Sequence, residues 1–462
     1  MKMPTACHAS LADTLAARAR EIPDAAALHC GGETYSCAQL ADDSARRAAS
    51  LAALGLPPAT IVALAAPASE LARTLLACQW AGHPFLPLDP ASAELRWPAF
   101  AAACTPAPLR LAALPGAATS ARPPAAVAAE APALVVATSG SEGEPRGVVL
   151  THAALAAAAV ASAARIPLRT GDTWLACLPL NHIGGLSVFW RCLAAGAAVR
   201  LHDGFDAAAA WAEIAAGRAT HVSLVPAMLA RLLDVSADAV PPATLRCALI
   251  GGAALSRPLW RRARKAGWPL FVSYGMSETA AQLATLPPTD DWQEGLVGTP
   301  LPGMQIAIGD DGRIRVRGPQ LMLGYLGGPA RNASPFEDGW LRTGDLGRLD
   351  DAGRLYVLGR GDDVLVSGGV NIHPLEVEAR LATCPGVADV AVTATPDPVW
   401  GDLVTALVVG SADAAAVEAW SRRHLPAPLR PRRTLAVAAL PRNALGKLER
   451  KLLRQLLAEA AA

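Results

Sequence analysis

The decapeptide TSGSEGEPRG, residues 138–147, combines residue types that suit a phosphate-binding loop. Its glycines permit backbone conformations that point several N–H groups into one concavity, and its hydroxyl side chains add donors. These residues are Thr138, Ser139, Gly140, Ser141, Gly143 and Gly147. Arg146 adds a fixed positive charge. The string does not fit a Walker A motif, because Pro145 stands where that motif requires its second glycine. A mobile surface loop would have the same composition, so the residues alone leave both interpretations open.

The chain around this loop alternates short apolar runs with helical stretches of roughly 10 to 15 residues, as far as residue 275. The apolar runs are IVALAA (61–66), FLPLD (85–89), TWLACLPL (173–180), HVSLVP (221–226), RCALIGG (246–252) and LFVSYG (270–275). This alternation predicts an α/β fold with a largely parallel sheet. Such sheets bind ligands at the carboxyl ends of their strands, where the glycine-rich and polar strings of this chain lie.

The second half of the chain follows a different pattern. IAIGDDGRIRVRG (306–318) and LDDAGRLYVLG (349–359) each predict a β-hairpin, and together they predict a small antiparallel subdomain. After Gly359, a strand, a helix from Pro374, two further strands and a C-terminal helix predict a small α+β domain. We therefore predict a large N-terminal domain over residues 1–361 and a C-terminal domain over residues 362–462.

Composition excludes several classes of protein. The formal net charge of +1 gives no electrostatic basis for binding nucleic acid or an anionic membrane. The nine cysteines form no C-x-x-C pair and no Cys/His cluster at zinc spacing, which favours reduced thiols in a cytoplasmic protein. No stretch has the continuous apolar core of a signal peptide or a transmembrane span, so we expect no membrane insertion.

The string TSGSEGEPRG is similar to [ST]-S-G-[ST]-[ST]-G-x-P-K-G, the signature of the adenylate-forming enzymes, which include acyl- and aryl-CoA ligases. Glu142 replaces a hydroxyl residue of that signature, and Arg146 replaces its lysine, keeping the charge in a bulkier, forked group. The resemblance continues in the family's order to the C-terminus. The other matching strings are LPLNHIGGL (178–186), IGGAAL (250–255), YGMSET (274–279), GWLRTGDLG (339–347), GRGDDVLVSGGVNIHPLEVE (359–378) and PRNALGKLERKLL (441–453).

The resemblance implies a site for ATP and Mg²⁺. The loop 138–147 would hold the β- and γ-phosphates, and Gly251 and Gly252 would let the backbone approach the adenine. The remaining nucleotide-site residues implied by the resemblance are Tyr274 against the adenine, Glu278 on magnesium, Thr279 on the phosphate, Asp345 on both ribose hydroxyls and Arg360 on the ribose or phosphate. Each also has a purely structural alternative, such as a tight turn, a capped helix start or a buried carboxylate satisfied by turn amides.

The resemblance also implies a mobile C-terminal domain. Asp362 would be its hinge, Gly368 and Gly369 would line the tunnel for a pantetheine thiol, and Lys447 would be the lysine of adenylation. His182 would gate the acyl pocket and contact the acid. The implied reaction joins a carboxylic acid to AMP with release of pyrophosphate, and then transfers the acyl group to coenzyme A as co-substrate.

The group that the chain most resembles is the o-succinylbenzoate–CoA ligases of menaquinone biosynthesis, on LPLNHIGGLSVFWRCLAAGAAVRL, HVSLVPAMLARLL and SYGMSETAAQ. That acid has two carboxylates, so Arg191 is the expected partner of the one that is not activated, and Ser223 is a second polar contact. A surface cation is the alternative for Arg191. Asn181 replaces the usual aromatic residue and favours a runner-up, a hydroxybenzoate or other aryl-acid ligase that loads CoA or an acyl carrier protein. A non-catalytic relative that binds nucleotide or acyl group is the third possibility.

Overall fold

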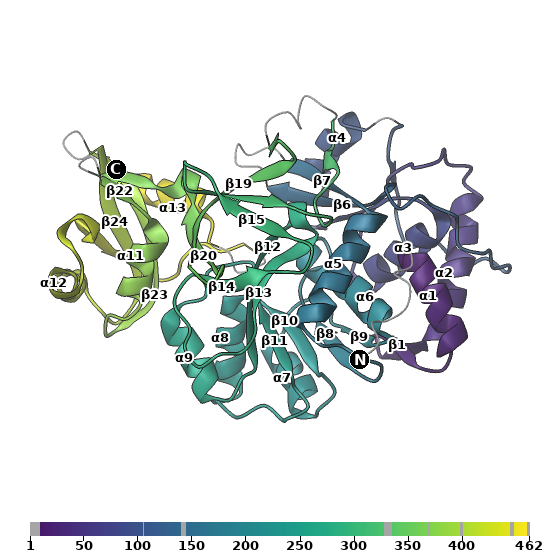
Figure 1. The fold of residues 1–462 in the computed structure, drawn as a ribbon, viewed down its shortest axis with the longest axis horizontal. Helices are drawn as coiled ribbons and strands as arrows, with labels where there is room; N and C mark the ends of the chain where they lie inside the picture. Colours follow the sequence, from purple (N-terminus) through teal and green to yellow (C-terminus); the bar gives the residue numbers. More distant parts are fainter. Residues whose placement is uncertain are drawn as a thin grey trace.

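The computed structural model describes residues 10–104, 106–139, 145–327, 335–367, 370–397, 401–443 and 448–459. A large body contains the N-terminal elements, and a smaller lobe containing the last elements lies at one end of the longest axis (Figure 1). The α/β class expected from the alternating pattern is confirmed. The helices of the described residues are α1 (Leu11–Glu21), α2 (Cys37–Ala52), α3 (Ala68–Ala81), α4 (Ala93–Ala102), α5 (His152–Arg165), α6 (Ile183–Ala195), α7 (Ala207–Ala215), α8 (Pro226–Val235), α9 (Arg257–Lys265), α11 (Pro374–Leu381), α12 (Ala414–His424) and α13 (Arg450–Glu459).

The larger sheet of the body, here called the main sheet, has a parallel half and an antiparallel half. Its parallel strands are β1 (Ala26–Cys30), β9 (Ala198–Leu201), β8 (Thr173–Ala176), β10 (His221–Leu224), β11 (Cys247–Ile250) and β12 (Leu270–Met276). At one edge, β2 (Glu33–Ser36) pairs antiparallel with β1. At the other side the antiparallel strands are β13 (Ala281–Leu286), β14 (Leu296–Pro300), β20 (Leu355–Arg360), β19 (Trp340–Leu349), β16 (Arg313–Arg317) and β15 (Gln305–Ile308), with β18 (Phe336–Glu337) on β19. Both expected hairpins are therefore present, and hydrogen bonds through β13 and β14 join them to the parallel half.

The second sheet of the body carries the glycine-rich loop. Its order is β17 (Gly324–Tyr325), β7 (Pro145–Thr151), β6 (Pro132–Ser139), β4 (Phe85–Leu88), β3 (Val62–Ala65) and β5 (Leu109–Arg110). The pairs β6–β7 and β7–β17 are antiparallel, whereas β3, β4, β5 and β6 run parallel. Thr138 pairs with Arg146, and Ser139 pairs with Pro145, so the two ends of the segment 138–147 lie on paired antiparallel strands.

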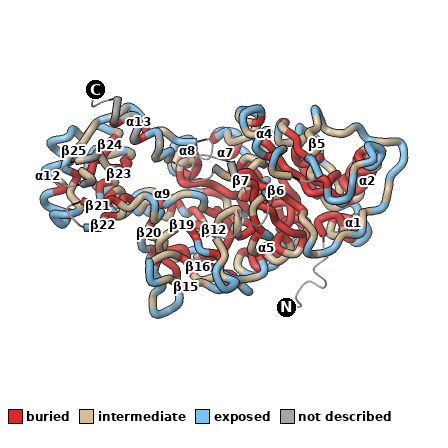
Figure 2. The backbone as a smooth tube through the Cα atoms, turned by 90° about the horizontal axis from the view of Figure 1, so that it is seen from above, coloured by how far each residue is buried: buried red, intermediate tan, exposed pale blue. Residues whose placement is uncertain are grey.

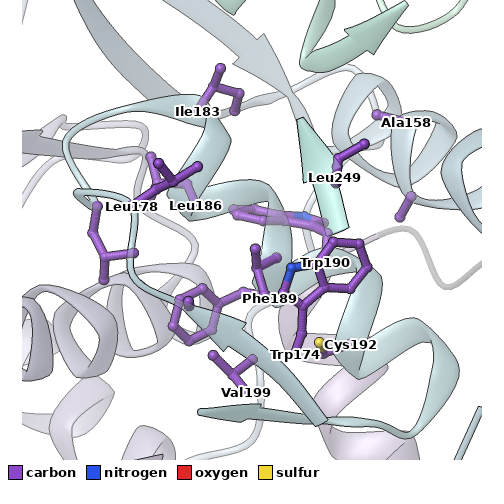
Figure 3. Packing of buried hydrophobic residues seen from close by; sticks show 14 of the residues in the cluster. Ala158, Trp174, Leu178, Ile183, Leu186, Phe189, Trp190, Cys192, Val199 and Leu249 are labelled. Carbon is purple, nitrogen blue, oxygen red and sulfur yellow. The ribbon is translucent and has the colours of Figure 1, made fainter. Parts of the chain in front are cut away.

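Helices α5 and α6 lie beside the sheets of the body (Figure 1), and their apolar side chains belong to one large core. Side chains from α6, β8, β9 and β11 meet in this core, among them Trp174, Phe189, Val199 and Leu249 (Figure 3). Helix α6 ends at Gly196, whose φ of 69° is the left-handed conformation that a C-terminal cap requires. Buried backbone follows the sheets through the middle of the body, with exposed segments at its rim (Figure 2). No helix within the described ranges is long and apolar enough to cross a membrane.

The C-terminal lobe has its own sheet and its own core. Its strands are β22 (Val370–Ile372), β21 (Leu365–Ser367), β24 (Gly401–Gly410), β23 (Val387–Asp397) and β25 (Arg433–Ala436), which pairs with β24. The core of the body extends to Tyr356, and the core of the lobe begins at Leu365. The predicted boundary at Asp362 lies between them; the division into residues 1–361 and 362–462 stays a prediction.

Candidate active site

The segment from Tyr274 to Thr279, at the carboxyl end of β12, occupies the junction between the parallel and antiparallel halves of the main sheet. β12 turns back immediately onto β13. A Cβ at Gly275 would lie 1.6 Å from the carbonyl oxygen of Ala281, so only glycine permits this approach. Ala280 and Ala281 have φ angles of 51° and 94°, the left-handed backbone that non-glycine residues adopt at a cost. Strain of this kind concentrates at functional sites, which agrees with the role expected of the segment.

Thr279 is fully buried in the 3-10 turn Ser277–Thr279 that follows β12. Its hydroxyl accepts a hydrogen bond from the Met276 N–H at 3.2 Å and lies 3.2 Å from the carbonyl oxygens of Met276 and Ala281. In this arrangement the hydroxyl holds its own turn together. Its expected contact with a phosphate stays a prediction.

Tyr274 is the first residue of this segment, and its side chain is hydrogen-bonded to Asp345. The Tyr274 hydroxyl donates to Oδ2 of Asp345 at 2.7 Å, and the Arg360 Nε lies 3.7 Å from Oδ1. Asp345 and Arg360 are register partners on β19 and β20. Burial, and then the Asp345 carboxylate, raise the pKa of Tyr274 well above its ordinary value, so the phenol stays protonated and donates. The structure therefore brings together three residues that the sequence assigned to the adenosine.

The glycines expected near the adenine follow β11, the neighbour of β12. A Cβ at Gly251 would lie 2.8 Å from Oγ of Ser273, the residue before Tyr274. Gly252 has a φ of 78°, which favours glycine. Gly251 and Tyr274 thus lie at the ends of adjacent strands, and the Ser273 hydroxyl occupies the space that a side chain at position 251 would need.

Glu278 lies near the other end of the segment and is hydrogen-bonded to Tyr325, a residue that the sequence analysis did not single out. Its Oε1 accepts a hydrogen bond from the Tyr325 hydroxyl at 2.9 Å. The guanidinium carbon of Arg146 lies 5.5 Å from the centre of the Tyr325 ring. Tyr325 belongs to GYL (324–326), an aromatic residue after a glycine close to the nucleotide motifs, and that was the available signal.

The donor set suits magnesium bound together with a phosphate substrate. Mg²⁺ is commonly held by one or two carboxylates plus substrate phosphates rather than by an all-protein cage. Glu278 supplies one carboxylate beside the strand that carries Arg146, and no group of three or more metal-ligating side chains occurs among the described residues. Glu278 would therefore hold the ion only in concert with the nucleotide.

His182 is the residue immediately before α6, six residues after the end of β8. Burial lowers its pKa to about 4, opposed by Asp89 and reinforced by Arg96. The imidazole is therefore neutral at physiological pH, which suits a residue that contacts an apolar acid without adding charge.

Arg191 and Ser223 are both buried in the core. Arg191 follows His182 nine residues later on α6, about 13.5 Å along the helix axis. It is 6% exposed and stacks 5.2 Å from the centre of the Trp174 ring, and its Nη1 has no hydrogen-bond partner. Burial lowers its pKa to about 10. Ser223 accepts a hydrogen bond from the Trp174 Nε1 at 3.0 Å. The alternative of a surface cation for Arg191 is wrong, and a substrate contact for either residue stays a prediction.

Asp362 is held by two arginines of the body, Arg313 on β16 and Arg360 on β20. Its Oδ1 lies 3.3 Å from Nη2 of Arg313, and its Oδ2 lies 3.5 Å from Nη2 of Arg360. The hinge role stays a prediction.

Among the residues of the phosphate loop, Thr138 donates a hydrogen bond to the Arg146 carbonyl at 3.3 Å, and of Ser139 the structure describes the backbone alone. The site residues outside the described ranges are Gly140, Ser141, Gly143, Gly368, Gly369 and Lys447.

Three histidines with lowered pKa values make stability depend on pH. Burial lowers the pKa of His152, His182 and His221 to about 4, against about 6.5 in an unfolded chain. The unfolded state binds more protons between these values, so the free energy of unfolding is expected to fall as the pH drops from about 6.5 toward 4. Each histidine contributes a slope of at most about 1.4 kcal/mol per pH unit. Urea unfolding at a series of pH values measures this slope. His221→Gln should reduce it, and an unchanged slope would contradict the assignment.

The sequence of the chain matches the profiles of a known enzyme family. The sequence profile of the AMP-binding enzymes matches residues 15–109 and 101–326, and the profile of the AMP-binding enzyme C-terminal domain matches residues 376–447. The chain is 40% identical over 334 residues to a 2-succinylbenzoate–CoA ligase of Geobacillus kaustophilus, covering 69% of this chain and 68% of that protein.

Two solved structures are similar over almost the whole chain. One is o-succinylbenzoate CoA synthetase (MenE) from Bacillus subtilis with the acyl-adenylate intermediate OSB-AMP, with a TM-score of 0.85 at 31% identity over 96% of this chain and 97% of that one. The other is ATP-bound MatB from Rhodopseudomonas palustris, with a TM-score of 0.89 at 27% identity over 98% of this chain and 100% of that one. The chain therefore belongs to the family of AMP-binding enzymes.

Proposed function

We propose that the protein is an AMP-forming acid–CoA ligase that activates o-succinylbenzoate with ATP and Mg²⁺ and transfers the acyl group to CoA. One observation carries the proposal: the six residues from Tyr274 to Thr279 connect a tyrosine–aspartate pair suited to a nucleoside with a glutamate beside the phosphate-loop strand. The curated relative and the solved neighbour with OSB-AMP identify the acid and the intermediate of such a reaction.

In the first half-reaction an oxygen of the substrate carboxylate attacks the α-phosphorus of ATP. The bond from that phosphorus to the oxygen bridging to the β-phosphate breaks, and pyrophosphate leaves with the electron pair. Asp345 and Tyr274 orient the nucleoside, while Thr279 and Lys447 would donate to the oxygens of the α-phosphate as its charge develops. Glu278 and the phosphates would hold Mg²⁺, which neutralises phosphate charge when bound.

In the second half-reaction the sulfur of CoA attacks the acyl carbonyl, the bond to AMP breaks, and the thiol proton is lost to solvent. Rotation of the C-terminal domain about Asp362 would remove Lys447 and bring Gly368 and Gly369 to the site. Glycines suit that position because a thiol on a long arm must pass close to the backbone.

The identity of the acid is the most specific part of the proposal. o-Succinylbenzoate keeps a second carboxylate after activation, and the chain buries a guanidinium whose Nη1 has no hydrogen-bond partner. A buried cation is costly unless an anion compensates it, so Arg191 is the proposed partner of that carboxylate. Asn181 favours the second candidate, an aryl acid with a ring hydroxyl, with CoA or a carrier-protein thiol as acceptor.

The function is tested by acid-dependent pyrophosphate release with ATP and magnesium, with CoA present and the thioester read by mass. We expect o-succinylbenzoate to be turned over selectively, giving its CoA thioester. Pyrophosphate release with a hydroxybenzoate and no CoA thioester would establish the carrier-protein alternative instead. If no acid supported pyrophosphate release, the remaining hypothesis would be a non-catalytic relative, and the proposal would be overturned.

Replacing Arg191 by glutamine tests the pocket. We expect kcat/KM for o-succinylbenzoate to fall by about 10-fold to 100-fold, the usual cost of a hydrogen bond to a charged group. Benzoate, which lacks the second carboxylate, is the matched control substrate and should change little. An equal loss for both acids would show that Arg191 supports the core through Trp174 and does not select the substrate.

A further inference from the structure

The segment 321–326, LMLGYL, lies between the second strand of the phosphate hairpin and Glu278. The Met322 N–H donates to the carbonyl oxygen of Glu278 at 2.9 Å. Next to it, the Leu323 N–H donates to the carbonyl oxygen of Val149 on β7 at 2.8 Å. One short segment therefore hydrogen-bonds to the turn that carries Glu278 and to the strand that follows the phosphate loop. We call it the bridging segment.

The bridging segment also packs against the root of the loop. The Leu326 N–H donates to the Gly147 carbonyl oxygen at 2.9 Å, and a Cβ at Gly147 would lie 2.5 Å from Cδ1 of Leu326. Glycine at position 147 lets Leu326 approach the strand at that point. β17, within the segment, continues the second sheet by pairing Tyr325 with Val148. The position of Tyr325 is consequently set by a sheet ladder and not by a free loop.

Tyr325 touches both of the groups that the segment lies between. Its hydroxyl donates to Oε1 of Glu278 at 2.9 Å, and its ring lies under the guanidinium of Arg146 at 5.5 Å. A glutamate side chain has three rotatable bonds, so one hydrogen bond to a fixed donor selects among its rotamers. A planar guanidinium stacks on an aromatic face better than an ammonium does, which gives a physical reason for arginine at a position where the family signature has lysine.

We propose that Tyr325 is a positioning residue that orients the Glu278 carboxylate for the metal and joins it to Arg146, so that metal ligand and phosphate-loop cation are preorganised as one unit. The proposal rests on the proposed function, which assigns Glu278 to magnesium and Arg146 to the phosphates. Loss of the Tyr325 hydroxyl should therefore weaken metal-dependent nucleotide binding. Without it, the free-energy cost of ordering the Glu278 carboxylate falls on the binding step.

Tyr325→Phe keeps the ring and removes the hydroxyl. We expect the Mg²⁺ concentration for half-maximal pyrophosphate release to rise about tenfold, the usual effect of losing one hydrogen bond to a charged group, with kcat largely recovered at saturating Mg²⁺. A second readout is independent of turnover: binding of Mn²⁺ in the presence of α,β-methylene-ATP, followed by electron paramagnetic resonance, should weaken by a similar factor. Binding of AMP without metal should not change.

Tyr356→Phe is the matched control, because Tyr356 is a buried tyrosine of the same body whose hydroxyl bonds to Gln293 at 3.3 Å. It should leave the metal dependence unchanged. Unchanged Mg²⁺ and Mn²⁺ dependence in Tyr325→Phe would overturn the proposal, and so would an equal shift in the control.

Arg146→Lys tests the other half of the link. Its effect on KM for ATP should be larger with Tyr325 present than in a Tyr325→Leu background, because leucine offers no ring to stack on. Equal effects in both backgrounds would overturn the coupling.

Glu278→Gln separates this inference from the proposed function. If Glu278→Gln leaves the metal dependence unaltered, the metal assignment itself fails. If Glu278→Gln shifts it and Tyr325→Phe does not, only the positioning role fails.

Discussion

Lys447→Ala is expected to slow acyl-adenylate formation by about 10²-fold to 10³-fold, the usual loss when one preorganised donor to a developing negative charge is removed. Thioester formation from a supplied acyl-adenylate should remain within a few-fold of the unaltered protein. The two effects differ because the proposed domain rotation carries the lysine away before the thiol attacks. The measurement is single-turnover kinetics of each half-reaction with purified acyl-adenylate as the second starting point.

Lys451→Ala supplies the matched control, since it removes a second cation four residues further along the same C-terminal segment. Both half-reactions should be retained in that variant. If Lys447→Ala slowed the two half-reactions equally, one conformation would serve both steps and the hinge at Asp362 would have no catalytic purpose.

The second large effect is expected from Asp345→Ala. This carboxylate accepts the 2.7 Å hydrogen bond from Tyr274 and would accept the two ribose hydroxyls. Loss of two hydrogen bonds to a charged group predicts a fall in kcat/KM for ATP of about 10²-fold or more. Turnover of 2′,3′-dideoxy-ATP, which lacks both hydroxyls, should change far less. Comparing the two nucleotides isolates the ribose contact from any general damage to the site.

Tyr274→Phe completes that experiment, because it removes the donor and keeps the carboxylate. We expect it to preserve the preference for ATP over the dideoxy nucleotide while lowering the free energy of unfolding by about 1–3 kcal/mol, measured by urea denaturation. If Asp345→Ala left the discrimination between the nucleotides intact, Asp345 would have a structural role only, and the ribose assignment would be wrong.

Features of the fold that depend on local sequence could be predicted from the chain alone. The alternation of apolar runs and helical stretches predicted β3, β4, β8, β10, β11 and β12, because a buried parallel strand needs a continuous apolar run and a covering helix needs an apolar face. The glycine-containing turns predicted the hairpins β15–β16 and β19–β20, since few residues adopt the backbone of a tight turn. The order of the motifs likewise identified the family before any geometry was known.

Tertiary structure decided the contacts between distant residues. The bond from Tyr274 to Asp345 joins positions 71 residues apart, and the bond from Tyr325 to Glu278 joins positions 47 apart. Tyr325 was missed because its neighbours in sequence say only that a strand is near, whereas its partner is set by the pairing of β17 with β7.

Arg191 illustrates the same division between local and distant information. It lies on α6, and an arginine on a helix can face water or the core. Packing of α6 against β8 put its guanidinium on Trp174, and no local pattern could have named that ring. Motif order identified the family, and local patterns identified the elements that carry its motifs. Only the fold decided which side chains meet, because register and packing are properties of the whole chain.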